Sequence, residues 1–283
     1  MAAYHRPDSL DKALAVLADG PVCIAAGCTD LLPATQGRAL AGPVLDITAI
    51  DELRGVSRGP DGWRIGAATT WTEVLRADDL PAAFDGLKLA AREVGSVQIQ
   101  NAGTLAGNLC TASPAADGVP CLLTLDATVE VRSVAGTQVV PLAGFLTGAR
   151  RTALEPGEMV TAILIPEVSG KGHFLKLGAR KSLIISIAMV AVRLAVADGK
   201  VAGAAVAVGA CSAVATRLPE LEAALIGLPV ADMAACASDD LVAPRLSPID
   251  DIRADIAYRK IAAAELLRRA LRDLGTVTAE RAA

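Results

Sequence analysis

The amino-acid sequence predicts an α+β protein in which helices and strands are mixed along three consecutive regions. Residues 9–47 alternate a helical pattern with short apolar runs that are typical of buried strands. Residues 185–210 contain two strand-like runs that meet at Asp198–Gly199, a dipeptide typical of hairpin turns. Residues 256–274 have the apolar spacing of a long amphipathic helix. This mixture of elements favours an α+β fold over an all-α or all-β one.

The first region, residues 1–56, is predicted to form one small subdomain. Ser9 is a suitable N-cap for a helix that carries four apolar residues on one face, Leu10, Ala13, Leu14 and Leu17. Residues 21–27 then predict a buried strand, and residues 29–39 predict a turn that leads into a helix. A second strand at 44–47 completes a βαβ-like unit.

The second region, residues 57–169, begins with a strand and a helix at 62–75 and continues with a helix near 87–94. It ends with two strand-like runs, at 127–134 and 159–166.

The third region, residues 170–283, combines the hairpin with the long C-terminal helix. The apolar residues expected near one face of this helix are Ile256, Ile261, Ala264, Leu267 and Leu271.

Composition excludes several classes of function. The chain has 283 residues and a net charge of −4, so it offers no broad basic face for nucleic acid. The chain has only two histidines, and its six cysteines include no CxxC pair. Both observations argue against a zinc ribbon or an iron–sulfur cluster. The first 14 residues lack the apolar core of a secretory signal, and the run 183–192 is too short to span a bilayer. We therefore expect a cytoplasmic protein with free thiols and no transmembrane segment.

Two segments with small side chains are candidate ligand sites. Residues 25–33 read AAGCTDLLP and follow a predicted strand, and residues 103–108 read GTLAGN. Neither matches the Rossmann or Walker pattern, and neither contains Lys or Arg. Such loops suit a ligand whose phosphates are held by backbone N–H groups. The simpler alternative is that Thr29 or Asp30 only caps a helix.

A third candidate is Asp117, the single charge between Asn101 and Pro120. Its carboxylate is suited to accept hydrogen bonds from ligand hydroxyls or from backbone N–H groups. The alternative role is that of a turn or helix cap.

Taken together, these segments resemble the FAD-binding medium subunits of molybdenum hydroxylases. The segments 25–33, 98–127 and 172–194 occur there in the same order and at similar separations, and residues 217–227 and 248–271 resemble the C-terminal flavoprotein domain. The family includes the carbon monoxide dehydrogenase medium subunit and the FAD-binding subunit of xanthine dehydrogenase. The resemblance implies a two-subdomain FAD-binding fold of the PCMH/vanillyl-alcohol-oxidase-like type, followed by a small α+β C-terminal domain.

The resemblance also implies which residues bind FAD. Backbone amides of two loops would hold the diphosphate, Asp117 would contact the flavin nucleotide, and an apolar residue would pack near the isoalloxazine ring. A lysine near the ring would stabilise the anionic reduced flavin. The positions that match are Ala25, Ala26, Gly27, Cys28, Thr29, Asp30 and Leu31; Thr104, Leu105, Ala106, Gly107 and Asn108; and Asp117, Val160, Lys176, Ile184 and Ile185. Without the family, Lys176 reads as a solvated lysine at a strand edge and Ile184–Ile185 as ordinary core.

Three positions depart from the family's pattern. The first loop usually has two adjacent glycines, and the second of them is Cys28 here. The paired glycines of the second loop read Ala106–Gly107, and Gln100 stands where an arginine is frequent. A positive φ at Cys28 or Ala106 would cost about 1 kcal/mol or more. Because the volumes change little, we expect FAD binding to be kept and Cys28 to be an inert thiol rather than a reactive one.

The function that the resemblance implies is electron transfer within an oxidoreductase complex. FAD would receive electrons from [2Fe-2S] clusters on a small subunit and pass them to an external acceptor. Substrate hydroxylation would take place at the molybdenum cofactor of a large subunit, in a heterotrimer or a dimer of heterotrimers. No catalytic acid or base and no metal ligand is expected in this chain. The substrate is open, and so is the choice between NAD, a quinone, a cytochrome and oxygen as acceptor.

Two other functions stay open. A stand-alone flavoprotein oxidoreductase would need a catalytic residue at the flavin, and Tyr4 and Tyr258 lie outside the motifs. A flavin-free structural subunit would have lost its site, with Cys28 and Ala106 as the marks of that loss. The second of these predicts a protein that stays colourless even after incubation with FAD.

Overall fold

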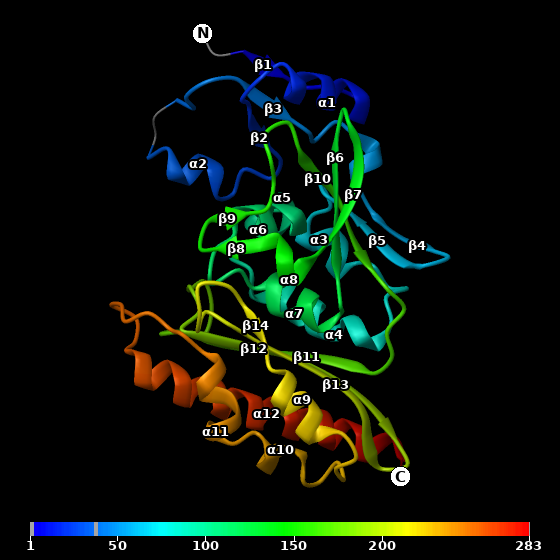
Figure 1. Cartoon of the computed structure of the whole chain (residues 1–283), viewed down its shortest axis with the longest axis vertical. Helices are drawn as coiled ribbons and strands as arrows, with labels where there is room; N and C mark the ends of the chain where they lie inside the picture. The colour runs from blue at the N-terminus through cyan, green and yellow to red at the C-terminus, as the bar shows by residue number, and fades with distance from the viewer. Residues whose placement is uncertain (1–2, 37–38, 283) are drawn as a thin grey trace. The chain divides into compact units, whose positions relative to one another are not determined.

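The computed structural model describes residues 3–36 and 39–282, which pack into two compact units (Figure 1). The units interleave along the chain and so do not follow the three consecutive regions. Unit 1 comprises Met1–Ala77, Ser96–Ala112 and Ala127–Glu167, and unit 2 comprises Asp78–Gly95, Ser113–Asp126 and Val168–Ala283. The boundaries expected after residues 56 and 169 stay predictions.

The first part of unit 1 is a small parallel sheet covered by one helix. Its strands are β1 (Tyr4–His5), β2 (Cys23–Ala25) and β3 (Val44–Asp46), in the order β1-β3-β2. Helix α1 (Leu10–Ala18) buries the predicted Leu10, Ala13, Leu14 and Leu17 against Leu45, Ile47, Ile50 and Leu53. Ser9 is the N-cap residue as predicted, although its side chain makes no capping hydrogen bond.

After β2 the chain forms helix α2 (Leu31–Ala34), the start of the predicted turn and helix at 29–39. Gly37 and Arg38 of that prediction lie outside the described residues. A short 3-10 helix, η1 (Asp51–Leu53), then connects this sheet to the next one.

The second part of unit 1 is an antiparallel sheet with the order β4-β5-β10-β6-β7. The central strand β10 (Met159–Ile165) is buried along almost its whole length, as its apolar sequence MVTAILI predicts. The other strands are β4 (Val56–Gly59), β5 (Gly62–Gly66), β6 (Thr128–Ser133) and β7 (Gly136–Pro141). The strand and helix predicted at 62–75 are confirmed as β5 and α3 (Trp71–Leu75), the latter with a complete capping box between Thr70 and Glu73.

Unit 1 is completed by short helices and a small hairpin, namely α5 (Val97–Ala102), α6 (Leu105–Thr111), α8 (Leu142–Phe145), β8 (Leu146–Gly148) and β9 (Arg151–Thr152). The interpretation of residues 103–108 as a loop was wrong: all but the first two belong to α6. Thr104 begins this helix because its hydroxyl accepts a hydrogen bond from the N–H of Gly107.

Unit 2 is built around the antiparallel sheet β11-β12-β13-β14. The predicted hairpin is confirmed as β12 (Ala188–Ala197) and β13 (Lys200–Gly209), with positive φ at Asp198 and Gly199 as a type I′ turn requires. The outer strands are β11 (Lys171–Leu177) and β14 (Thr216–Arg217).

Helices cover both faces of this sheet (Figure 1). One face carries α12 (Ile256–Ala282), which builds an apolar core with the side chains of Val190, Val192 and Val206. The shorter helices of this layer are α9 (Pro219–Leu225), α10 (Met233–Cys236), α11 (Asp239–Val242) and η3 (Ala243–Arg245). The other face carries η2 (Ala82–Phe84), α4 (Asp85–Glu93), which confirms the helix predicted near 87–94, and α7 (Gly118–Thr124).

The predicted apolar face of α12 was partly wrong. Ala264, Leu267 and Leu271 are buried, but Ile256 and Ile261 are 46% and 58% exposed. In the first turns of α12 the buried residue is instead Arg259. Its guanidinium donates to the carbonyl oxygens of Ile187 and Ala210. None of the helices within residues 3–36 and 39–282 is long and apolar enough to cross a membrane.

Candidate functional site

The first candidate loop, Ala25–Leu31, runs from the last residue of β2 to the first residue of α2 and packs against the chain between α5 and α6. A Cβ atom on Gly27 would lie 1.9 Å from the carbonyl oxygen of Ala102 and 2.7 Å from the Cα atom of Gly103. Both contacts are with backbone, which cannot rotate away. Glycine at position 27 is therefore required for the two predicted segments to meet in unit 1.

The second candidate segment forms the first turns of α6. Ala106 is buried in helical conformation, and its φ is not positive. A Cβ atom on Gly107 would lie 2.7 Å from the Oγ1 atom of Thr104, so this glycine leaves room for the capping hydroxyl. The substitution at Ala106 therefore introduces no backbone strain, in contrast to the cost that a positive φ would have brought.

The two segments share free backbone donors. Among the described residues, the N–H groups of positions 26–31 donate to no protein acceptor, and neither do those of Thr104 and Ala106. Most backbone N–H groups in folded proteins are paired, so a run of six consecutive unpaired ones is unusual. Successive unpaired N–H groups attract anions. The backbone of unit 1 thus fits the diphosphate of a dinucleotide, and it does so without lysine or arginine within either segment.

Arg150 is a charged neighbour of the first loop that sequence reasoning missed. It lies between β8 and β9, and its Nη1 atom is 2.9 Å from Oδ2 of Asp30 and 3.4 Å from the carbonyl oxygen of Thr111. Arg150 therefore links the loop to the end of α6. No local pattern could have identified it, because it lies 120 residues from Asp30 in the sequence.

Cys28 takes a backbone conformation that favours glycine. Its φ is +55°, in the left-handed region. Burial raises the pKa of the Cys28 thiol, with smaller contributions from Asp46 and Cys23. A thiol with a raised pKa stays protonated at neutral pH, which supports the expectation of an inert side chain.

Cys28 and Ala106 stand where the family usually has glycine, and replacing them by glycine is expected to change the stability in opposite directions. Cys28→Gly removes strain at a positive φ and should raise the free energy of unfolding by about 1 kcal/mol. Ala106→Gly loosens a helix and should lower it by about 0.5–1 kcal/mol. Urea denaturation of both variants of the whole chain measures this difference. Equal changes in the two variants would contradict the assignment of strain to Cys28.

In unit 2, Asp117 lies immediately before α7 and forms a buried polar cluster. The Nζ atom of Lys176 lies 3.0 Å from its Oδ2, and the hydroxyl of Ser186 donates to its Oδ1 at 3.1 Å. Lys176 is only 8% exposed at its side chain, so the interpretation as a solvated lysine was wrong. Burial raises the pKa of the Asp117 carboxyl, and Lys176 and Ser186 offset part of this effect. Ser186 was not predicted, because its hydroxyl lies within an apolar run.

Ile184 and Ile185 lie between β11 and β12, next to Ser186. Ile185 is 52% exposed and Ile184 is half-buried, so the alternative that they are ordinary core was wrong. The side chain of Ile184 lies over the backbone of Gly178, where an added Cβ atom would lie 2.4 Å from its Cγ2 atom. Exposed aliphatic side chains can pack against a flat ring.

The predicted site residues thus fall into two groups, each described within its own unit. Unit 1 brings together the first loop and the start of α6, with Val160 buried in β10, a strand that contacts α6. Unit 2 brings together Asp117 and Lys176 and holds Ile184–Ile185 beside their partner Ser186.

Comparison with known families covers nearly the whole chain. The family described as the FAD binding domain in molybdopterin dehydrogenase matches residues 1–168, and the carbon monoxide dehydrogenase flavoprotein C-terminal domain matches residues 173–274. The chain is 38% identical over 193 residues to the nicotinate dehydrogenase FAD-subunit of Eubacterium barkeri, a match that spans 65% of the chain and only 65% of that relative.

Two further relatives match over almost their full length. The nicotine 6-hydroxylase medium subunit of Paenarthrobacter nicotinovorans is 31% identical over 97% of this chain and 98% of its own. Among solved structures, a chain of the reconstituted CO dehydrogenase from Oligotropha carboxidovorans superposes with a TM-score of 0.90 at 29% identity, covering 98% of both chains.

Proposed function

The chain belongs to the family of FAD-binding domains of molybdopterin dehydrogenases, and from this premise we propose that it is the FAD-containing electron-transfer subunit of a multi-subunit molybdenum hydroxylase. FAD is the cofactor of this family, and its members are subunits of oxidoreductase complexes. The observation that carries the proposal is the set of N–H groups in the two segments of unit 1 that donate to no acceptor among the described residues. Such donors suit a dinucleotide diphosphate. Neither segment contains a lysine or an arginine that could bind the diphosphate instead.

Each group of residues has its own role in this proposal. The N–H groups of 26–31, Thr104 and Ala106 bind the diphosphate. Gly27 permits the close approach of the two segments, and Gly107 leaves room for the hydroxyl of Thr104. Asp117 accepts hydrogen bonds from the flavin nucleotide, while Lys176 provides a positive charge beside it. Ile184 and Ile185 pack against the ring and exclude water, and Val160 borders the cofactor.

When bound, FAD supplies both one-electron and two-electron chemistry. We propose that electrons arrive from [2Fe-2S] clusters of a small partner subunit and leave to an external acceptor, and that a large subunit holds the molybdenum cofactor. The relatives named medium subunit or FAD-subunit support a partition of this kind. The proposed arrangement is a cytoplasmic heterotrimer or dimer of heterotrimers, with domains at 1–56, 57–169 and 170–283.

The test is the visible absorption spectrum of the purified whole chain, before and after incubation with FAD. We expect flavin bands and close to one FAD released by acid per chain. The matched control is incubation with riboflavin, which lacks the diphosphate and should not be retained. A chain that retains no FAD, or retains riboflavin equally well, would contradict the assignment of the two loops.

A further inference from the structure

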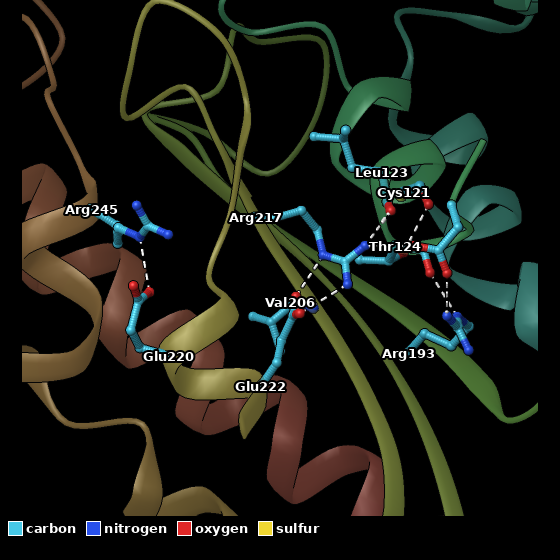
Figure 2. Close-up of polar contacts among 10 residues, drawn as sticks. Cys121, Leu123, Thr124, Arg193, Val206, Arg217, Glu220, Glu222 and Arg245 are labelled. Carbon is cyan, nitrogen blue, oxygen red and sulfur yellow. Dashed lines mark hydrogen bonds and ion pairs between the residues drawn. The ribbon is translucent and has the colours of Figure 1, made fainter. Parts of the chain in front are cut away.

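The end of helix α7 is held by two arginines that come from the sheet of unit 2. Arg193 of β12 donates from Nε to the carbonyl oxygen of Thr124 at 2.6 Å, and Arg217 of β14 donates from Nη1 to that of Leu123 at 2.8 Å (Figure 2). The last carbonyl groups of a helix have no partner within the helix. The two guanidinium groups supply these partners and place positive charge where the helix dipole is negative.

Acidic residues hold both arginines in this position. Asp126 accepts from Arg193 at 3.0 Å and from Arg217 at 2.9 Å, one arginine on each oxygen. Glu222 binds Arg217 through two bonds of 2.5 and 2.9 Å and also accepts the N–H of Val206 in β13 (Figure 2). Arg217 therefore has a fixed orientation, because a guanidinium held by two parallel bonds cannot rotate freely.

Helix α7 needs such support from outside. It has only seven residues, two of which are Gly118 and Pro120, and an isolated helix of this length and composition is not stable. All seven residues are buried, and Pro120 fits against Gly209, where a Cβ atom would lie 3.1 Å from its Cγ. Its position therefore depends on contacts with the sheet.

The two ends of α7 are rigidly connected. A seven-residue helix is about 10 Å long, and Asp117 immediately precedes its first residue. At that end Lys176 and Ser186 bind Asp117, and at the other end Arg193 and Arg217 bind the last carbonyl groups. Both pairs come from the same sheet or from the segment that leads into it.

We propose that Arg193 and Arg217 are positioning residues for the flavin site, because they fix α7 and thereby the carboxylate of Asp117. The inference rests on the proposed function, in which Asp117 contacts FAD. It adds a role for the C-terminal sheet: β12 and β14 set the geometry of a cofactor contact that the sequence places some 70 to 100 residues earlier.

The experiment is a double-mutant cycle on FAD affinity, measured by flavin fluorescence with the whole chain. Arg217→Met should weaken FAD binding about tenfold, a loss common when the group behind a ligand contact is removed. Asp117→Asn should weaken it as well, and the double variant should bind no more weakly than Asp117→Asn alone. Arg217→Lys keeps the charge and should recover part of the affinity.

The control is Arg245→Met, which removes an exposed ion pair with Glu220 at 2.8 Å in the same unit and does not touch α7 (Figure 2). Its FAD affinity should stay within about twofold of the unmodified chain. If Arg217→Met lowers only the thermal stability, or if its effect adds to that of Asp117→Asn, the positioning role is wrong.

A second measurement is independent of FAD. Hydrogen exchange followed by mass spectrometry should show faster exchange of residues 113–120 in Arg217→Met and in Arg217→Lys, and unchanged exchange in Arg245→Met. Faster exchange confined to residues beyond 120 would overturn the inference. If the unmodified chain fails to bind FAD while this exchange pattern is found, the proposed function fails and the coupling through α7 stands.

Discussion

Replacing Gly27 by alanine is expected to abolish tight FAD binding by the whole chain. The new Cβ atom would lie 1.9 Å from the oxygen and 2.5 Å from the carbon of the Ala102 carbonyl. Real Cβ contacts are longer than 3 Å, so one of the two segments must move by about 1 Å or more. Such a movement separates the N–H groups of the first loop from those of Thr104 and Ala106. We expect a loss of about 3 kcal/mol, on the order of 100-fold in Kd.

The matched control for this prediction is Gly144→Ala in α8 of the same unit. A Cβ atom there meets nothing within 4 Å, and its φ is not positive. Its FAD affinity and its stability should therefore equal or slightly exceed those of the unmodified chain. Isothermal titration with FAD measures both variants. A Gly27→Ala chain that binds FAD as tightly as the control would show that the two loops do not form one site.

The elements that the sequence predicted well are those whose pattern is local. The apolar face of α1 repeats with helical spacing and is buried as expected, from Leu10 to Leu17. The hairpin β12–β13 follows from two apolar runs and one Asp-Gly turn. In both cases neighbouring residues carry enough information to specify the element, because spacing and turn chemistry agree.

Elements that depend on distant partners could not be predicted from such patterns. Residues 103–108 read as a loop, because small side chains have no helical apolar spacing, yet Thr104 caps a helix there. Ile256 and Ile261 fit an amphipathic spacing, but the buried position belongs to Arg259, which sequence rules place outside. The carbonyl groups of Ile187 and Ala210, some 50 to 70 residues away, make this burial favourable together with the carboxylate of Asp251.

The residues of the candidate site also divide into those that a local sequence pattern reveals and those that depend on distant partners. The loops and Asp117 were found through motifs that are continuous in sequence. Arg150 and Ser186 were missed because their contacts with Asp30 and Asp117 join positions 120 and 69 residues apart. Their roles follow from strand register and loop packing, which one sequence does not reveal.

The burial of Arg259 leads to the second large prediction, that Asp251→Asn destabilises unit 2. Arg259 is 2% exposed, and its Nη2 atom lies 2.7 Å from Oδ1 of Asp251. Removing the carboxylate charge leaves a buried guanidinium without its counter-ion. Breaking a fully buried pair costs about 3–5 kcal/mol. Asp251 keeps 19% of its side chain exposed, so we expect the free energy of unfolding at pH 7 to fall by about 2–3 kcal/mol.

The dependence of this effect on pH provides a further check. The backbone N–H of Arg253, together with the side chains of Arg259 and Arg253, lowers the pKa of Asp251 from 3.8 to about 2. A carboxyl group with a lowered pKa stabilises the folded state above its ordinary value and loses this contribution as the pH falls through the folded value. The difference between the unmodified chain and Asp251→Asn should therefore be full at pH 5–7 and shrink between about pH 4 and pH 2.

Urea denaturation across this pH range, with Asp239→Asn as control, separates the buried pair from a surface one. Asp239 binds Arg268 at 3.2 Å in the same unit, but its side chain is 58% exposed. Its replacement should change the stability by less than about 0.5 kcal/mol, because water screens such a pair at any pH. If Asp251→Asn behaved like Asp239→Asn at pH 7, backbone carbonyl groups such as those of Ile187 and Ala210 would be enough to hold Arg259. An arginine at the start of α12 could then be buried without an acidic partner.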